Sequence, residues 1–245
     1  MSDGPQLDIL PDPQSMAESA AAWIAEQIAA TDDVFRMALS GGSTPRLLYS
    51  VLASSAFRER IEWRRVELFW GDERFVPHTD ERSNYRMVRE TLLAHAPVLI
   101  DHVHPIVIEA DPESTARRYE ALLKSIYGLE TLVPSQPLFD LVLLGLGDDG
   151  HTASLFPGSR VLGERTQWVA GVEDRDEPRV TLTYPAIASS RAVAFLVTGE
   201  EKADMVRRVQ EGDRSLPAAR VTSEGDVVWF VDRAAASRLP AHASA

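Results

Sequence analysis

The sequence contains no cysteine, and only two of its 25 basic residues are lysines, Lys124 and Lys202. The lack of cysteine excludes disulfides, thiolate catalysis and cysteine-ligated zinc sites. The formal net charge is −12 and no segment is rich in Lys or Arg, which argues against non-specific nucleic-acid binding. An anionic ligand would therefore need a local cationic site.

The sequence also lacks any apolar run of the roughly 20 residues that a membrane helix needs. No basic residue precedes Arg36, so the chain shows no positively charged start of a signal peptide. We therefore expect a cytoplasmic protein with no membrane segment. The chain has 245 residues and 44% hydrophobic content, which suit a single domain over residues 1–245, with flexible ends at 1–12 and 237–245.

Apolar strand patterns alternate with amphipathic helix patterns along the chain. Helices are predicted from a capping box of Ser15 and Glu18, from an N-cap at Thr44, from Asp111 to a C-cap at Gly128, and from a second capping box of Thr198 and Glu201. Strands are predicted at 34–39, 66–70, 139–146, 179–183, 192–197 and 227–231. This alternation predicts an α/β fold, with a parallel-rich central sheet and helices on both faces. Ligands bind such sheets at the carboxyl ends of strands, so the loops 40–44, 71–77, 147–157 and 198–202 are the expected site.

The first of these loops is a candidate phosphate site. Its residues are Ser40, Gly41, Gly42, Ser43 and Thr44. The glycines let the backbone approach a ligand closely, the hydroxyls donate hydrogen bonds, and the following helix offers free N–H groups. The alternative is an ordinary turn between a strand and a helix.

The second loop carries charges of both signs at a strand end, with Asp72 and Glu73 beside Arg74. A carboxylate next to a guanidinium suits a site that moves a proton or stabilises an oxyanion. The alternative is a solvated salt bridge on the surface.

The third loop begins with GLGDDG (145–150), which matches the dinucleotide-binding pattern G-x-G-x-x-G. Its two aspartates would face a pyrophosphate, and Pro157 follows too soon for the usual crossover helix. The alternative is catalytic: His151 follows the turn directly, and Asp149 could orient its imidazole as a general base. A third possibility is that His151 only stabilises the turn.

Two further cations lie near expected strand ends. Lys202 lies in the first turn of a predicted helix, where the helix dipole disfavours a cation unless an anion binds nearby. Arg179 begins a predicted strand and could clamp a phosphate. Either residue could instead be solvent-exposed. No metal site is expected, because the spacing of His102 and His104 lacks a matching third ligand.

Six segments, in this order, resemble the 6-phosphogluconolactonase family, which is related to the glucosamine-6-phosphate deaminases. The segments are LSGGSTP, WGDERFVP, SNYRM, LLGLGDDGHTASLFPGS, PRVTLTYPAI and TGEEKADMV. The resemblance covers residues 15 to 235 or so, nearly the whole chain.

The resemblance implies hydrolysis of 6-phospho-D-glucono-1,5-lactone to 6-phospho-D-gluconate in the oxidative pentose phosphate pathway, without a cofactor. It implies a sugar-phosphate isomerase-like (Rossmann-like) core. It makes His151 the general base with Asp149 beside it, and places Asp72 and Arg74 at the reacting end. The residues that it places around the phosphate are Ser40, Gly41, Gly42, Ser43, Thr44, Arg179 and Lys202.

Two other functions stay open. A glucosamine-6-phosphate deaminase would be expected to have a loop like DEY at 72–74 and a run like HIAFNEP at 151–157, and both segments depart from this pattern. A non-catalytic sugar-phosphate-binding module is the other alternative. The expected partner is a small sugar-phosphate lactone, with no nucleic acid or membrane, and the expected state is a monomer or a weak homo-oligomer.

Overall fold

A central sheet of seven strands, all parallel, organises the computed structural model, which describes residues 6–240. The strand order is β1-β10-β9-β6-β2-β3-β5. The bounds are β1 Gln6–Leu10, β2 Phe35–Leu39, β3 Val66–Trp70, β5 Val103–His104, β6 Phe139–Leu144, β9 Ser190–Val197 and β10 Asp226–Asp232. The predicted parallel-rich α/β fold is confirmed.

A second, antiparallel sheet contains β4 (Asp72–Arg74), β8 (Arg179–Leu182) and β7 (Val169–Val172) in that order. The sequence predicts the strand at 179–183 as one of the alternating series, but the structure places it in this separate sheet. The segment 71–77, predicted as a loop, contributes the edge strand β4. The small sheet therefore follows directly from the carboxyl end of β3.

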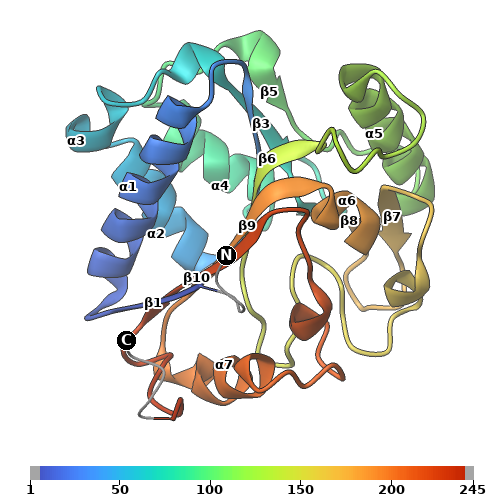
Figure 1. The fold of residues 1–245 in the computed structure, drawn as a ribbon. Coiled ribbons are helices and arrows are strands. Elements are labelled where there is room, and N and C mark those ends of the chain that lie inside the picture. Colours follow the sequence, from blue (N-terminus) through green and yellow to red (C-terminus); the bar gives the residue numbers. More distant parts are fainter. Residues whose placement is uncertain (1–5, 241–245) are drawn as a thin grey trace.

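Helices cover both faces of the central sheet, with α1 and α2 on one side and α5 on the other, beside the small sheet (Figure 1). The bounds are α1 Pro13–Ala30, α2 Ser43–Leu52, α3 Ser55–Arg58, α4 Asn84–Val88, α5 Pro112–Tyr127, α6 Tyr184–Ala188 and α7 Ala203–Gln210. Gly128 ends α5 with a φ of 84°, as its predicted cap position requires.

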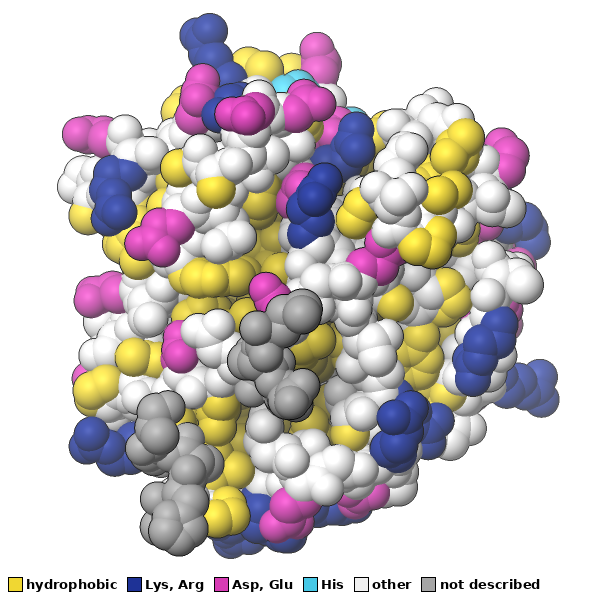
Figure 2. Space-filling view, viewed as in Figure 1, with side chains coloured by type: hydrophobic (Ala, Val, Ile, Leu, Met, Phe, Trp, Pro, Cys, Tyr) yellow, Lys and Arg dark blue, Asp and Glu magenta, His cyan; other side chains and the backbone are white. Residues whose placement is uncertain are grey.

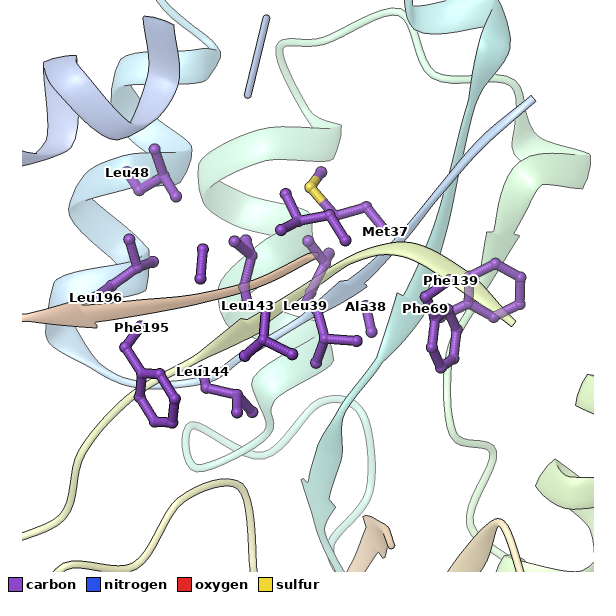
Figure 3. Packing of buried hydrophobic residues seen from close by; sticks show 14 of the residues in the cluster. Met37, Ala38, Leu39, Leu48, Phe69, Phe139, Leu143, Leu144, Phe195 and Leu196 are labelled. Atoms are coloured by element: carbon purple, nitrogen blue, oxygen red, sulfur yellow. The ribbon is translucent and has the colours of Figure 1, made fainter. Parts of the chain in front are cut away.

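The central strands are buried on both faces, which explains their unbroken apolar runs. Leu143 and Leu144 are consecutive in β6, and both are buried, as are Phe195 and Leu196 in β9. Figure 3 shows these side chains leaving their strands in opposite directions and packing against neighbours from other elements. This burial fixes the strand order, and with it the set of loops that meet at the carboxyl edge.

The prediction of a flexible segment at 1–12 is wrong for residues 6–12. Residues 6–10 form β1, which pairs with β10 from Gln6 opposite Val228 to Leu10 opposite Asp232. Asp12 then caps α1, because its carboxylate accepts the Ser15 N–H at 2.8 Å. Residues 237–239 form turns, and residues 1–5 and 241–245 lie outside the described part of the chain.

Two other helix starts differ from the predicted capping residues. Gly42, and not Thr44, is the N-cap of α2. The predicted capping box at Thr198 and Glu201 does not form, because a 3-10 helix at Glu200–Lys202 precedes α7. Both differences arise where glycines with positive φ, Gly42 and Gly199, set the direction of the chain.

Figure 2 shows acidic and basic side chains interspersed over the visible face of the molecule. Within residues 6–240, no helix combines the length and apolar character needed to cross a membrane.

Candidate active site

One pocket of about 260 Å³ lies where the loops after β2, β6 and β9 meet the small sheet. Strands β9, β6 and β2 are neighbours in the central sheet, so the loops at their carboxyl ends converge. The predicted site residues that line the pocket are Ser40, Gly41, Gly42, Ser43, Thr44, Asp72, Arg74, His151, Arg179 and Lys202. Asp149, the remaining predicted residue, is hydrogen-bonded to His151.

The glycines of 145–150 shape a tight turn that presents His151. The Gly147 N–H donates to the His151 carbonyl at 2.8 Å, and the Gly150 N–H donates to the Gly147 carbonyl at 3.0 Å. A Cβ on Gly147 would lie 2.0 Å from Nδ1 of His151, so only glycine leaves room for the ring. No α-helix follows before β7, so the crossover helix that a dinucleotide site requires is missing from this segment.

Asp149 holds the His151 imidazole through two contacts. One carboxylate oxygen lies 2.5 Å from Nδ1 and also accepts the His151 backbone N–H at 3.1 Å. Partial burial acts to raise the pKa of Asp149, but the hydrogen bonds from His151 outweigh it, so the pKa lies below its ordinary value. Because the carboxylate accepts from Nδ1, the other ring nitrogen, Nε2, is left for a ligand.

The loop 40–44 provides a second set of donors. Gly42 has a φ of 105°, and no side chain caps α2, so the first N–H groups of this helix have no intrahelical partner. The hydroxyls of Thr44 and Thr198 lie 2.8 Å apart, which ties this loop to the loop after β9. A free helix N-terminus with hydroxyl groups favours an anion.

Asp72 also lines the pocket and is almost fully buried. Its carboxylate accepts the Ser154 hydroxyl at 2.6 Å and the Asn84 amide at 3.2 Å. Asn84 also packs on Gly41, where a Cβ would lie 2.0 Å from its Oδ1. Sequence reasoning missed the roles of Asn84 and Ser154, although both lie in the segments SNYRM and HTASLFP that carry the family resemblance.

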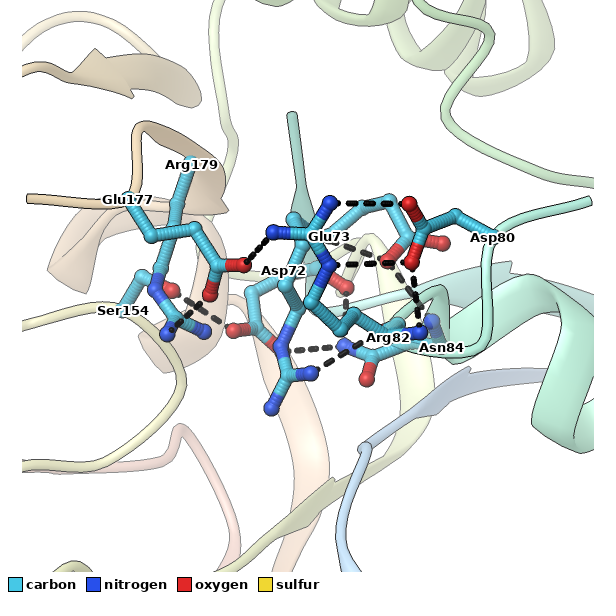
Figure 4. A network of polar contacts seen from close by, with 9 residues as sticks. Asp72, Glu73, Asp80, Arg82, Asn84, Ser154, Glu177 and Arg179 are labelled. Carbon is cyan, nitrogen blue, oxygen red and sulfur yellow. Dashed lines mark hydrogen bonds and ion pairs between the residues drawn. The ribbon is translucent and has the colours of Figure 1, made fainter. Parts of the chain in front are cut away.

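Glu73 is completely buried, so the interpretation of this loop as a solvated salt bridge is wrong for this residue. Its carboxylate accepts the N–H groups of Arg74, Asn84 and Tyr85 and the Ser83 hydroxyl, at 2.7 to 3.0 Å. Burial nevertheless raises the pKa of Glu73 above its ordinary value. Glu73 does not line the pocket; it fixes the start of α4 against β4 (Figure 4).

Arg74 and Arg179 are direct cross-strand partners in the antiparallel pair β4·β8, although the family resemblance implies that they lie at different ends of the substrate. Arg179 contacts Glu177 at 2.9 Å, and the Nε atoms of both arginines are buried with no partner among the described residues. Burial lowers the pKa of Arg179, and the nearby charge of Arg74 lowers it further. Two adjacent guanidinium groups with free donors favour a bound anion.

Charged contacts connect this wall to the surrounding loops. Arg82 contacts Glu177 at 3.0 Å and Asp80 at 2.8 Å, as Figure 4 shows. Lys202, which also lines the pocket, makes an ion pair with Asp148. His104, considered as a possible metal ligand from its spacing, instead contacts Glu67 at 2.8 Å.

The model of the family described as glucosamine-6-phosphate isomerases/6-phosphogluconolactonase matches residues 11–229. The chain is 36% identical over 242 residues to the 6-phosphogluconolactonase of Synechocystis sp., covering 96% of this chain and 98% of that protein. It is 37% identical over 255 residues to the 6-phosphogluconolactonase of Streptomyces coelicolor, covering 98% and 97%.

Solved structures agree with these relatives. The 6-phosphogluconolactonase from Trypanosoma brucei superposes with a TM-score of 0.81 at 32% identity, covering 98% of this chain and 100% of that one. A monomeric glucosamine-6-phosphate deaminase shares the fold, with a TM-score of 0.79 at 24% identity over 95% of this chain and 99% of that one. From its sequence, its fold and the residues gathered in its pocket, the chain belongs to the glucosamine-6-phosphate isomerase/6-phosphogluconolactonase family.

Proposed function

We propose that this protein is a 6-phosphogluconolactonase, which hydrolyses 6-phospho-D-glucono-1,5-lactone to 6-phospho-D-gluconate in the oxidative pentose phosphate pathway. The observation that carries the proposal is the His151–Asp149 pair at a pocket that also contains three cations and a helix N-terminus. An acid–base pair beside a site for a dianion fits a phosphorylated ester. The names of the Synechocystis, Streptomyces and Trypanosoma relatives support the same substrate.

In the proposed reaction, His151 acts as a general base through Nε2. It takes a proton from a water molecule as the water oxygen bonds to C1 of the lactone, and the carbonyl oxygen becomes an oxyanion. Arg74 or loop N–H groups donate to this oxyanion. The bond between C1 and the ring oxygen then breaks, and the imidazolium returns its proton to that oxygen, giving the open carboxylic acid. Asp149 orients the ring and stabilises its charged form throughout.

The phosphate is proposed to bind at residues 40–44, with Arg179 and Lys202 supplying positive charge. Binding the remote end of the substrate holds C1 near His151, which lowers the entropic cost of the attack. The mechanism needs no metal or cofactor, and dialysis against a chelator should leave the rate unchanged.

The deaminase and the non-catalytic module remain the alternatives. The first is less consistent with the sequence, because the segments at 72–74 and 151–157 depart from the pattern expected of a deaminase. In a non-catalytic binding module, the His151–Asp149 pair would have no catalytic role.

One assay separates the three functions. Acid release is measured from freshly generated 6-phosphogluconolactone, with the spontaneous rate subtracted, and ammonia release from glucosamine 6-phosphate is measured in parallel. Acid release that scales with enzyme concentration supports the lactonase. Ammonia release without lactone hydrolysis would assign the deaminase, and binding without turnover of either would assign the module.

We also propose that the whole chain acts as one domain in the cytoplasm, as a monomer or a weak homo-oligomer. Sedimentation velocity over a range of protein concentrations tests the oligomeric state, and a single cooperative unfolding transition tests the single domain.

A further inference from the structure

Phe156 is an aromatic residue that touches the proposed general base. Its ring centroid lies 4.4 Å from that of His151, with the ring planes inclined at 42°. Phe156 lies in the loop that follows His151 and is 9% exposed. The lactonase mechanism above gives this residue no role.

Three contacts define the position of the imidazole. Asp149 holds Nδ1, and the bare Cα of Gly147 leaves the space that the ring occupies. These two contacts restrain one edge and one side of the ring, but they do not set its tilt. The packed ring of Phe156 supplies that third restraint.

The same aromatic ring also reaches the charged wall of the pocket. The guanidinium carbons of Arg175 and Arg179 lie 4.6 and 5.6 Å from its centroid, within the range of cation–π contacts. Arg175 is anchored by a hydrogen bond from Nη2 to the Pro157 carbonyl at 2.8 Å. Phe156 therefore bridges the acid–base group and a cation proposed to bind phosphate.

We propose that Phe156 is a positioning residue for His151, which holds the imidazole in the plane that directs Nε2 at the water molecule attacking the lactone carbonyl. The kinetic test of this proposal rests on the proposed lactonase function. Reaction rates are steeply sensitive to such alignment, because a displacement of about 1 Å can cost about a hundredfold in rate.

Phe57 provides a matched control for the loss of a buried ring. It is also 9% exposed and also has a cation near its ring, since the guanidinium carbon of Arg60 lies 5.3 Å from the centroid. It lies in α3 and does not line the pocket. Phe156→Leu and Phe57→Leu therefore remove equivalent packing, but only the first touches His151.

The kinetic test compares Phe156→Leu, Phe156→Tyr and Phe57→Leu on the phosphorylated lactone. Phe156→Leu should lower kcat by about tenfold or more and change KM much less, because Arg179 keeps its contact with Glu177. Phe156→Tyr, which retains the ring, should restore most of kcat, and Phe57→Leu should leave kcat unchanged. A wild-type kcat in Phe156→Leu, or an equal loss in Phe57→Leu, would overturn the proposal.

A spectroscopic test stands independently of the reaction. The Phe156 ring should shift the proton resonances of the His151 imidazole by its ring current, and Phe156→Leu should remove that shift while Phe156→Tyr keeps it. Unchanged His151 resonances in Phe156→Leu would overturn the proposal. If the wild-type chain hydrolysed no lactone, the proposed function would fail, and the resonances would still decide whether the Phe156 ring packs on His151, which positioning requires.

Discussion

The two walls of the pocket are built in different ways. The wall with His151 comes from one short segment, residues 145–151, whose hydrogen bonds run mostly within the turn itself. The wall with Asp72, Arg74 and Arg179 joins two strands that are far apart in the sequence, and its carboxylates are buried. The His151 ring in the first wall is partly exposed, whereas the side chains of the second wall are connected by hydrogen bonds and ion pairs.

This difference indicates a division of tasks. A ring that accepts and returns a proton must reach water and substrate, so the first wall is open and held by a few contacts. A site that binds an anion gains from donors fixed before the ligand arrives. Variants of His151 should therefore change kcat, whereas variants of Arg179 and Glu73 should change KM or stability.

The largest effect is expected from His151→Ala. It should lower kcat by on the order of 10³-fold, because general acid–base catalysis contributes on the order of 10² to 10⁴. KM should change little, since the proposed phosphate-binding groups remain. Initial rates of acid release above the spontaneous rate measure both constants. His95→Ala is the matched control, because His95 is exposed and does not line the pocket. Near-wild-type turnover in His151→Ala would show that His151 is not the general base.

Glu73→Gln should lower the free energy of unfolding and leave kcat unchanged. The substitution places an amide N–H₂ group against backbone N–H donors, so the free energy of unfolding should fall by about 2 kcal/mol. Burial raises the pKa of Glu73 in the folded state. The contribution of Glu73 to the free energy of unfolding is therefore complete at low pH and is lost as the pH rises through that raised pKa. The cost of the substitution should therefore be larger at about pH 4 than at about pH 7.

Urea unfolding at the two pH values measures this dependence. Glu59→Gln is the control, since the Glu59 side chain is 74% exposed. A cost that is independent of pH, or a loss of kcat without loss of stability, would contradict the structural role of Glu73.

How well each wall could be predicted from the sequence follows from the same difference. The segment GLGDDGH contains its own turn, its histidine and its carboxylate, so its geometry is local and its spacing predicts it. The pairing of Arg74 with Arg179 depends on an antiparallel sheet that the alternating pattern does not indicate. The three-residue strand β4 is too short to show a period.

The fold was predictable for a similar reason. Runs such as FDLVLLGL require burial on both faces, and alternation with helices then requires parallel strands. The edge strand β1 escaped prediction because only one side of it is paired, so its sequence mixes polar and apolar residues. The start of α2 and of the 3-10 helix before α7 escaped because Gly42 and Gly199 turn the chain through their backbone conformation, which leaves no polar side chain to recognise.

A smaller effect, confined to binding, is expected from Arg179→Met in the second wall. Methionine keeps much of the apolar length of the side chain but removes the guanidinium, so KM should rise by about tenfold while kcat changes little. Arg64→Met, at an exposed position, is the control. A fall in kcat with KM unchanged would place Arg179 at the reacting end of the substrate and Arg74 at the phosphate.

The smallest effect is expected from Asp148→Asn, in the turn that carries His151. Asp148 pairs with Lys202 and is 80% exposed, so an incoming phosphate must compete with this carboxylate for the lysine. Removing the negative charge should free Lys202 and lower KM by about twofold to threefold, since exposed ion pairs are weak. The gain should shrink as salt is added, because mobile ions screen exposed charges.

The competing possibility is that Asp148 holds Lys202 in the position that binds phosphate. KM would then rise in Asp148→Asn, and the rise would persist in high salt because it comes from lost geometry. Asp204→Asn is the control, because Asp204 makes a similar exposed ion pair with Arg207 outside the pocket and should leave KM unchanged. The sign of the change in KM therefore decides whether Asp148 competes with the phosphate for Lys202 or holds Lys202 in the position that binds the phosphate.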